Sequence, residues 1–375
     1  EDHDLHPKSQ QLAYTIKNEK GISLFIEPRQ LNKKFGQEIT NGQEKGCVYG
    51  KAVHRYEFGI SKGTFWSNSG RYLAFYKKDE RMVSDYPLVD ISSRPAALNS
   101  IKYPMAGDKS HYVQIGVFDT KNSSVYYLKI KGAKDQYLTN ITWSPDENHI
   151  YVAIVNREQN HMKLDKYDAS TGNLESTLFE EKNDKYVEPE HGPYFLNNDS
   201  KKFVWFSERS GYQHLYLYSS TGKLISTLTE GEWEVSKIIG NTWSDILLVE
   251  GTGRDGRAKS LYSVSLPSSD AYAESGVNVK LISSDKGYNS GLACKSGDFI
   301  LKTYTSIETN REISLIDLNG KEYRTILNSD NPLDDYEIGS MEMLELKADD
   351  GTALYARMIK PSHFDPANKY PVLVY

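Results

Sequence analysis

Residues 54–67, HRYEFGISKGTFWS, contain two neighbouring features that could do chemistry. Gly59, Ser61 and Gly63 match G-x-S-x-G, the pattern in which a serine hydrolase presents its nucleophile on a sharp turn between a strand and a helix. Glu57 offers a carboxylate that could pair with a cationic group of a ligand. The first question is therefore whether Ser61 reacts or whether Glu57 binds.

The residues that follow Ser61 do not predict a nucleophile. Gly63 is followed by Thr-Phe-Trp and then by Ser-Asn-Ser-Gly, which is a strand pattern that runs into a turn. A nucleophile elbow needs a helix at that point, and it is too tight for a residue as large as Lys62 beside the serine. We therefore interpret the match at Ser61 as a coincidence of spacing.

The chain as a whole is a repeat of short strands. A turn rich in Ser, Pro, Asp, Asn and Gly is followed by an alternating apolar strand and then by a second strand pair with its own turn. Amphipathic helices are nearly absent. The repeats begin at His6, Phe65, Ile141, Tyr194, Gly240 and Leu292.

Intervals of roughly 46 to 76 residues between these starts are typical of the four-stranded blades of a β-propeller with loop insertions. The predicted fold class is therefore all-β, a propeller in which neighbouring blades bury each other's apolar faces. We expect Trp66 and Trp143 to pack between blades, because large aromatic side chains dominate such cores.

Two segments depart from the repeat. Residues 78–111 are long and polar, carry three prolines, and include apolar side chains such as Tyr86 and Leu88, which predicts either a projecting arm or a mobile insertion. Residues 335–375 contain a hairpin with its turn at 349–351 and then an apolar strand at 370–375. Because a strand that ends with the chain lacks part of its ladder, we predict a propeller over 1–334 and the start of a second, truncated domain over 335–375.

Composition excludes several classes of function. The net charge of −6 argues against nucleic acid as a partner, and no apolar run is long enough to span a membrane. Cys47 and Cys294 match no metal spacing. Asp330, Asp334 and Asp335 do not form a calcium-binding loop either, because they lack its spacing and its glycine. No metal and no cofactor is therefore expected.

Short motifs occur in order along the whole chain: VHR at 53–55, EFG at 57–59, KGTFWS at 62–67, YPMAG at 103–107, LTNITWSPDE at 138–147, YVEP at 186–189, HLYLY at 214–218, GEWEV at 231–235, HFDP at 363–366 and KYPV at 369–372. Together they resemble the dipeptidyl peptidase IV family of the prolyl oligopeptidase superfamily. Within that family the motifs are most similar to the bacterial prolyl tripeptidyl peptidases and dipeptidyl aminopeptidases IV.

The resemblance implies an eight-bladed propeller, of which about six blades are present here. The propeller covers an α/β-hydrolase domain, which would begin in residues 335–375. The enclosed cavity admits peptides that lose an N-terminal di- or tripeptide after proline. The Ser-Asp-His triad would lie beyond Tyr375, so this chain alone should be inactive. The resemblance also implies a homodimer formed through the arm Asp79–Lys109, and a periplasmic or secreted bacterial protein.

Glu57 then has a specific predicted role. A peptidase that releases a fixed number of residues must recognise the free amino terminus of its substrate, and a carboxylate does this through a charge-assisted hydrogen bond. The corresponding site of dipeptidyl peptidase IV has adjacent glutamates, whereas the neighbour of Glu57 here is Tyr56. With only one carboxylate, the sequence is as compatible with release of a tripeptide as with release of a dipeptide. Tyr56 and Glu188 are further predicted substrate contacts. The alternative is that Glu57 is a surface charge paired with Arg55.

The histidines are not predicted to be catalytic. His54, His191 and His214 have no serine and aspartate partners that the sequence can assign, so we interpret them as structural. The competing class for the whole chain is a non-catalytic propeller that mediates protein interaction or sensing. That class predicts a gene that ends near Tyr375, whereas the peptidase predicts a further G-x-S-x-G flanked by a strand and a helix.

Overall fold

The computed structural model describes residues 2–18, 21–27, 36–40, 44–242, 245–253, 256–267 and 278–375. Within these residues nearly every regular element is a β-strand, and the only helical segments are two 3₁₀ turns, η1 (His54–Tyr56) and η2 (Leu196–Asn198). The contacts divide the chain into two compact units. The first contains the described residues up to Glu230, and the second those of Gly231–Leu266 and from 278 to Tyr375.

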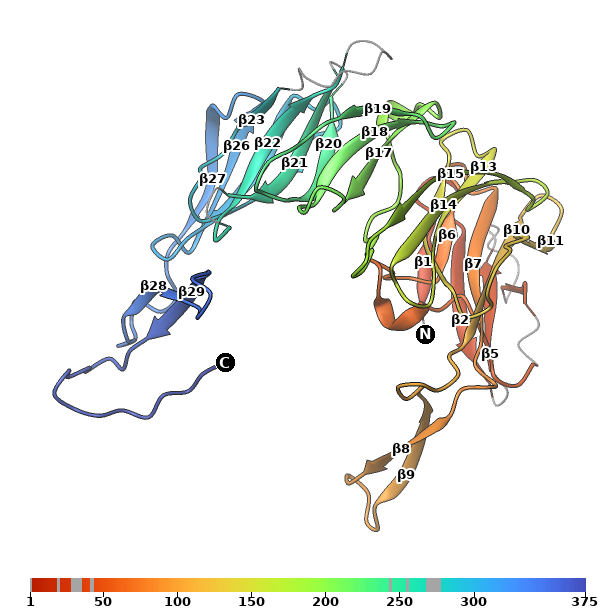
Figure 1. The fold of residues 1–375 in the computed structure, drawn as a ribbon, viewed down its shortest axis with the longest axis horizontal. Helices are drawn as coiled ribbons and strands as arrows, with labels where there is room; N and C mark the ends of the chain where they lie inside the picture. The colour runs from red at the N-terminus through yellow and green to blue at the C-terminus, as the bar shows by residue number, and fades with distance from the viewer. Residues whose placement is uncertain are drawn as a thin grey trace. The chain divides into compact units, whose positions relative to one another are not determined.

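The first unit contains successive antiparallel meanders of four strands (Figure 1). The first meander has β1 (His3–Leu5), β2 (Leu12–Lys17), β3 (Ile22–Glu27) and β4 (Gln37–Glu38), and the second has β6 (Thr64–Trp66), β7 (Tyr72–Asp79), β10 (Tyr112–Asp119) and β11 (Ser124–Tyr127). Strand β5 (Cys47–Tyr49) bridges β3 and β7. The third has β12 (Tyr137–Trp143), β13 (His149–Val155), β14 (His161–Asp168) and β15 (Leu174–Lys182), and the fourth has β16 (Tyr194–Phe195), β17 (Lys202–Ser207), β18 (His214–Ser219) and β19 (Leu224–Thr227).

The second unit continues the same pattern. Its meanders are β20 (Val235–Asn241), β21 (Ile246–Thr252), β22 (Lys259–Ser265) and β23 (Val279–Leu281), then β24 (Tyr288–Ala293), β25 (Phe299–Thr305), β26 (Arg311–Asp317) and β27 (Glu322–Ser329). A separate hairpin follows, β28 (Met341–Lys347) and β29 (Ala353–Ile359). The six repeats predicted from the sequence correspond to these six meanders.

The second strand of each repeat explains why the sequence folds this way. In β7, β13 and β17 the apolar residues run without alternation, and nearly all of them are buried. A strand that is buried on both faces needs such a run, whereas a strand with one solvent-exposed face alternates apolar and polar residues. The sheets of the first unit therefore pack against one another through the faces of these inner strands.

The two tryptophans confirm this packing. The Trp143 indole N–H of the third meander donates a hydrogen bond of 2.9 Å to the carbonyl oxygen of Phe65 in the second. The Trp66 indole N–H makes the equivalent bond of 3.1 Å to the carbonyl oxygen of Asp4 in the first. Each tryptophan thus fixes its own meander to the preceding one, as predicted.

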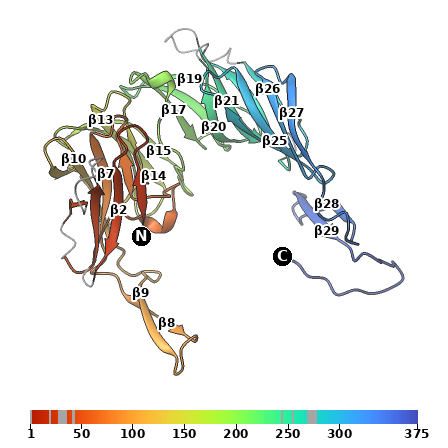
Figure 2. The same cartoon turned by 180° about the vertical axis from the view of Figure 1, so that it is seen from behind.

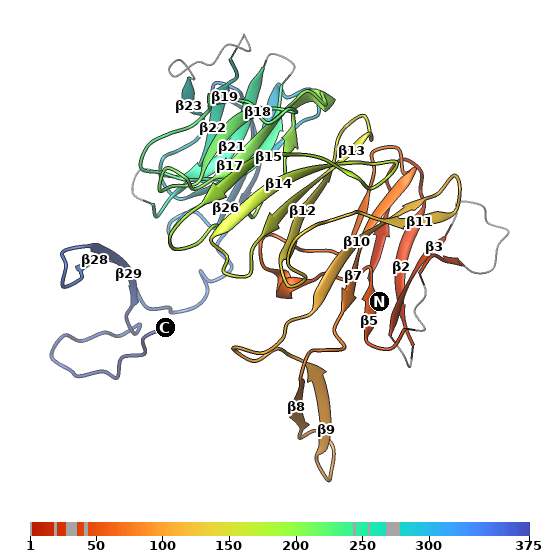
Figure 3. The same cartoon turned by 45° about the vertical axis from the view of Figure 1, so that its right-hand side comes forward.

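The insertion at 78–111 is more regular than the sequence indicates. It is a two-stranded antiparallel ribbon, β8 (Asp85–Asp90) paired with β9 (Ala97–Lys102), and the sequence did not predict this pairing. Figures 1 and 2 show the ribbon projecting from the first unit, and Figure 3 shows it extending away from β7 and β10. The prolines are compatible with this pairing, because Pro95 and Pro104 lie outside the two strands and Pro87 lies in a ribbon in which both strands are edges.

The predicted hairpin near the end of the chain is confirmed, with Gly351 at a φ of 87° in the turn between β28 and β29. The strand predicted at 370–375 is not observed, because no described segment pairs with it. Apolar composition alone does not make a strand, since the backbone N–H and C=O groups also need a partner.

Candidate functional site

Glu57 lies in a tight turn between β5 and β6 that has unusual backbone geometry. His54, Arg55 and Tyr56 have φ values of 52°, 55° and 68°, and Phe58 has a φ of 56°. All four are left-handed, and each such non-glycine residue costs about 1–3 kcal/mol and persists only where its surroundings enforce it. The turn therefore depends on contacts that hold its side chains in place.

Two buried side chains anchor the turn to the third meander. Phe58 is buried, with its ring centroid 5.0 Å from that of Tyr137. The His54 ring is also buried and lies 4.9 Å from the ring of Tyr137. The backbone N–H of Leu138 donates to His54 Nε2 at 3.3 Å, so the proton of the neutral imidazole is on Nδ1.

His54 Nδ1 lies 3.2 Å from His111 Nε2, and the two rings are stacked with centroids 5.0 Å apart. Burial, reinforced by the charge of Arg157, holds the pKa of His54 well below its usual range. Burial, together with the charges of Lys78 and Arg157, lowers the pKa of His111 to about 4. Both rings are therefore neutral at physiological pH, and His54 donates to His111.

The turn presents the Glu57 side chain to a cavity of about 680 Å³. Glu57 is exposed, and its carboxylate makes no hydrogen bond or ion pair with any residue that the structure describes. Glu57 is a surface charge, as the alternative has it, but no ion pair joins it to Arg55 in the described residues. Arg55 lies over the ring of Tyr103 instead, with its guanidinium carbon 4.3 Å from the ring centroid.

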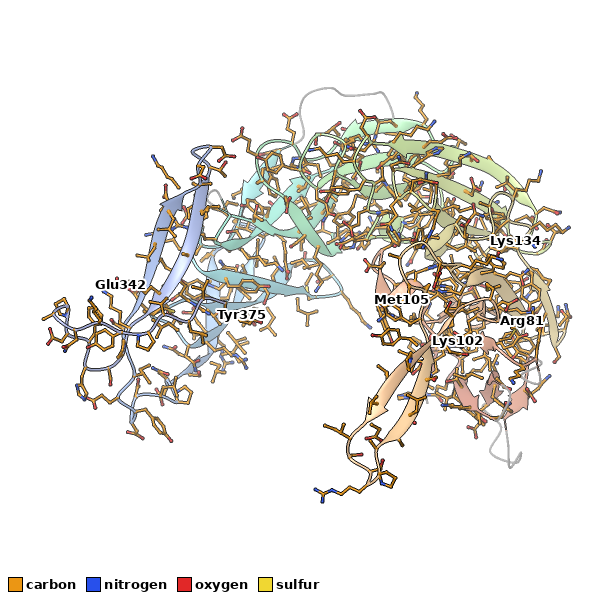
Figure 4. All side chains as sticks on the ribbon, turned by 60° about the horizontal axis from the view of Figure 1, so that its bottom comes forward. Arg81, Lys102, Met105, Lys134, Glu342 and Tyr375 are labelled. Carbon is orange, nitrogen blue, oxygen red and sulfur yellow. The ribbon has the colours of Figure 1, made fainter. Side chains whose placement is uncertain are left out.

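Other charged groups that line the same cavity are already engaged. Lys78 pairs with Glu80 at 2.8 Å. Lys51 pairs with Asp2 at 3.2 Å, and Lys102, which Figure 4 shows where the ribbon joins the first unit, pairs with Asp85 at 3.1 Å. Arg55 and Arg157 also line the cavity, but within the described part of the chain they contact tyrosines and not carboxylates. Glu57 is thus a carboxylate left available for a ligand.

The other two predicted contacts have different positions. Tyr56 is 70% exposed and lines the cavity of Glu57. Glu188 is exposed and lines a neighbouring cavity of about 160 Å³, together with Arg209. The two loops touch, since a β-carbon at Gly59 would lie 2.0 Å from the carbonyl oxygen of Glu190. The structure therefore brings the two loops together but gives Glu188 a cavity of its own.

Ser61 has none of the surroundings of a nucleophile. It is exposed, no helix follows it, and no histidine of the described residues lies within hydrogen-bonding distance of it. The lysine beside it forms an ion pair with Asp4 at 3.0 Å. The glycines of the motif have packing roles, because a β-carbon at Gly63 would lie 2.3 Å from the carbonyl carbon of Lys51.

The remaining histidines fit the structural interpretation. His214 is buried, with its Nδ1 3.0 Å from the hydroxyl of Thr229. His191 packs on Phe206 with ring centroids 4.1 Å apart, and burial lowers its pKa. Among the described residues, no three His, Cys, Asp or Glu side chains are grouped to hold a metal ion, and no helix could cross a membrane.

Sequence reasoning missed three residues of the site. Tyr103 and His111 come from the segment that returns from the ribbon, and Arg157 comes from the turn after β13. His111 and Arg157 line the cavity, whereas Tyr103 contacts Arg55. Arg157 donates to the Tyr137 hydroxyl, the ring of which supports His54. Tyr103 belongs to the YPMAG motif, which offered a signal, but nothing in the sequence places that motif beside Glu57.

Four-stranded antiparallel meanders packed face to face define the blades of a β-propeller. The family model described as "Dipeptidyl peptidase IV (DPP IV) N-terminal region" matches residues 1–311. The chain belongs to this family. A putative dipeptidyl aminopeptidase IV from Bacteroides ovatus superimposes with a TM-score of 0.87 at 36% identity, over 99% of this chain and 53% of that chain.

Porphyromonas gingivalis dipeptidyl peptidase 4 shares the fold, with a TM-score of 0.84 at 22% identity over 99% of this chain and 52% of that chain. Among curated proteins, the probable dipeptidyl-aminopeptidase B of Botryotinia fuckeliana is 24% identical, over 98% of this chain and 42% of that protein. The dipeptidyl peptidase 4 of Arthroderma otae is 24% identical, over 98% of this chain and 48% of that protein. The chain therefore spans about half the length of the relatives that it matches.

Proposed function

We propose that this chain is the propeller of a serine exopeptidase that releases N-terminal di- or tripeptides after proline. In this role the propeller gates access to the catalytic cavity, and Glu57 binds the ammonium group of the substrate. The nucleophile lies in a part of the gene product outside this chain. The observation that carries the proposal is the unpaired Glu57 carboxylate, which a left-handed turn presents to a cavity of about 680 Å³.

The chemistry of this site favours an ammonium ligand. A carboxylate that gains an N⁺–H donor makes a shorter and stronger hydrogen bond than a neutral pair does. Tyr56, exposed on the same cavity wall, offers a flat face to the substrate backbone next to the amine. A single carboxylate at a fixed place therefore sets the distance between the substrate's amino terminus and the bond to be cut.

The test uses the complete gene product and chromogenic peptides. We expect hydrolysis of either Xaa-Pro or Xaa-Xaa-Pro p-nitroanilides with a free amine, and a clear preference for one of them, because one carboxylate at a fixed place selects one length. Acetylation of the amine should lower kcat/KM by more than about tenfold, since it removes a charged hydrogen-bond partner. Equal rates for acetylated and free peptides would refute amine recognition, and no hydrolysis of either would favour the non-catalytic propeller.

We further propose that the β8–β9 ribbon joins two copies of the protein. Its apolar side chains are turned to solvent, with Val89, Ile91 and Leu98 at 65%, 85% and 66% exposure. A two-stranded ribbon cannot bury such a face by itself. A second subunit would cover it.

Substituting lysine at Val89, Ile91 and Leu98 should convert the dimer to a monomer of half the mass in light scattering, because each charge would have to be buried in the interface. The matched control places lysine at Asn99 and Ser100, which are exposed on the same ribbon. If the apolar variant keeps the wild-type mass, the ribbon does not mediate assembly.

A further inference from the structure

The segment that returns from the ribbon contacts the Glu57 turn at two points. Tyr103 lies under the guanidinium of Arg55 at 4.3 Å, and His111 accepts a hydrogen bond from His54 at 3.2 Å. Arg55 and His54 belong to the run of left-handed residues that precedes Glu57. Both contacts therefore act on the part of the turn whose geometry is costly.

The two contacting residues are themselves held firmly. The backbone N–H of Tyr103 donates to the carbonyl oxygen of Ser84 at 3.1 Å, and its ring packs on that of Tyr86 with centroids 5.7 Å apart. His111 directly precedes β10, whose pairing with β7 begins at Tyr112. Each residue thus connects the turn to a paired strand and not to a free loop.

Within the turn itself, little fixes the backbone. The N–H groups of Tyr56 and Glu57 donate to the carbonyls of Val53 and His54 at 3.2 and 3.1 Å, which are bonds that a relaxed turn could also make. Left-handed residues with side chains persist only where the surroundings over-determine them. The side chains of His54, Arg55 and Phe58 supply that constraint. Tyr137 holds His54 and Phe58 from the third meander, and His111 and Tyr103 hold His54 and Arg55 from the ribbon segment.

We propose that Tyr103 and His111 are positioning residues, which hold the Glu57 carboxylate toward the cavity by trapping the side chains of Arg55 and His54. The inference rests on the proposed role of Glu57 in binding the substrate's amine. Residues at the base of the ribbon would then contribute to the recognition of the substrate's amine without touching the amine themselves. A cation stacked on an aromatic face and a hydrogen bond between a buried and a half-buried imidazole both restrict the side chains that they join.

The first test compares two substitutions of Tyr103 in the complete gene product. Tyr103→Leu removes the aromatic face and should raise KM for free-amine Xaa-Pro substrates by roughly three- to tenfold with kcat nearly unchanged. Tyr103→Phe keeps the face, and the Tyr103 hydroxyl makes no hydrogen bond within the described residues, so KM should stay within about twofold of wild type. Equal effects of the two variants would overturn the proposal.

The second test asks whether Tyr103 acts through Glu57. In a Glu57→Gln background, Tyr103→Leu should add less than about a twofold change in KM, because a positioning contact has no effect once its target is removed. A merely structural role would give independent, multiplying effects, which would contradict the proposal. If Glu57→Gln alone leaves KM unchanged, the proposed function fails; if only Tyr103→Leu leaves it unchanged, this inference fails and the proposed function stands.

The third test uses His111 and keeps the inference testable if Tyr103→Leu does not fold. His111→Leu removes the acceptor for His54 and should raise KM, whereas His111→Gln retains an acceptor and should recover part of the loss. His214→Gln is the matched control, since His214 is another buried imidazole that does not line the Glu57 cavity. It should change thermal stability without changing KM, and a KM effect equal to that of His111→Leu would refute the positioning role.

Discussion

Replacing Glu57 with glutamine in the complete gene product is expected to raise KM for peptides with a free amino terminus roughly 10- to 150-fold. The estimate follows from the loss of a charged hydrogen-bond partner, which costs about 1.5–3 kcal/mol. The ammonium group is present in the ground state and in the transition state alike. The interaction is therefore uniform binding, and kcat should change little.

The acetylated substrates sharpen this prediction. An acetylated peptide cannot form the ion pair, so Glu57→Gln should leave its kcat/KM almost unchanged. The ratio of kcat/KM for the free-amine peptide to kcat/KM for the acetylated peptide should therefore fall toward one. Thermal unfolding should be unaffected, because the exposed Glu57 carboxylate makes no contact with other described residues.

Glu80→Gln is the matched control for Glu57→Gln. Glu80 lines the same cavity, but Lys78 already holds it at 2.8 Å. Its substitution should have at most a small effect on KM, as expected for a half-exposed ion pair. If both glutamine variants raise KM equally, the loss of either carboxylate from this cavity has the same effect, and Glu57 has no special role.

The sequence predicted the strands well for a physical reason. Inner strands such as β13 are buried on both faces, so they need an unbroken apolar run, and the turns between them need Gly, Asn or Asp. Those requirements are local, and they repeat six times along the chain. Trp143 could likewise be assigned to packing, because few other surroundings suit so large a side chain in such a repeat.

The site was only partly predictable, because its constraints are not local. Glu57 could be chosen from its motif, but the left-handed turn that presents it depends on His111 and Tyr103, about 50 residues further along the chain. Glu188 was predicted as a further substrate contact, and the structure places it at a cavity separate from that of Glu57. Strand pairing was missed in the ribbon because prolines usually interrupt strands, whereas here only Pro87 lies within one.

The G-x-S-x-G motif gives the second large effect, and it concerns Gly59 and not the serine. Gly59 has a φ of 68°, and a β-carbon there would meet the carbonyl oxygen of Glu190 at 2.0 Å. Gly59→Ala must therefore strain the backbone and also push the 186–190 loop away. We expect the free energy of unfolding to fall by roughly 2–4 kcal/mol, the sum of a left-handed alanine and an overpacked contact.

Ser61→Ala, two residues further on, is the matched control. Ser61 is exposed and has no catalytic partner among the described residues, so its substitution should change the free energy of unfolding by less than about 0.5 kcal/mol. Chemical denaturation of this chain measures both variants. In the complete gene product, Gly59→Ala should also raise KM, because the displaced loop releases one side of the Glu57 turn, whereas Ser61→Ala should retain full activity. Loss of activity in Ser61→Ala with an intact fold would make Ser61 the nucleophile after all, and a stable Gly59→Ala would show that the two loops are not coupled.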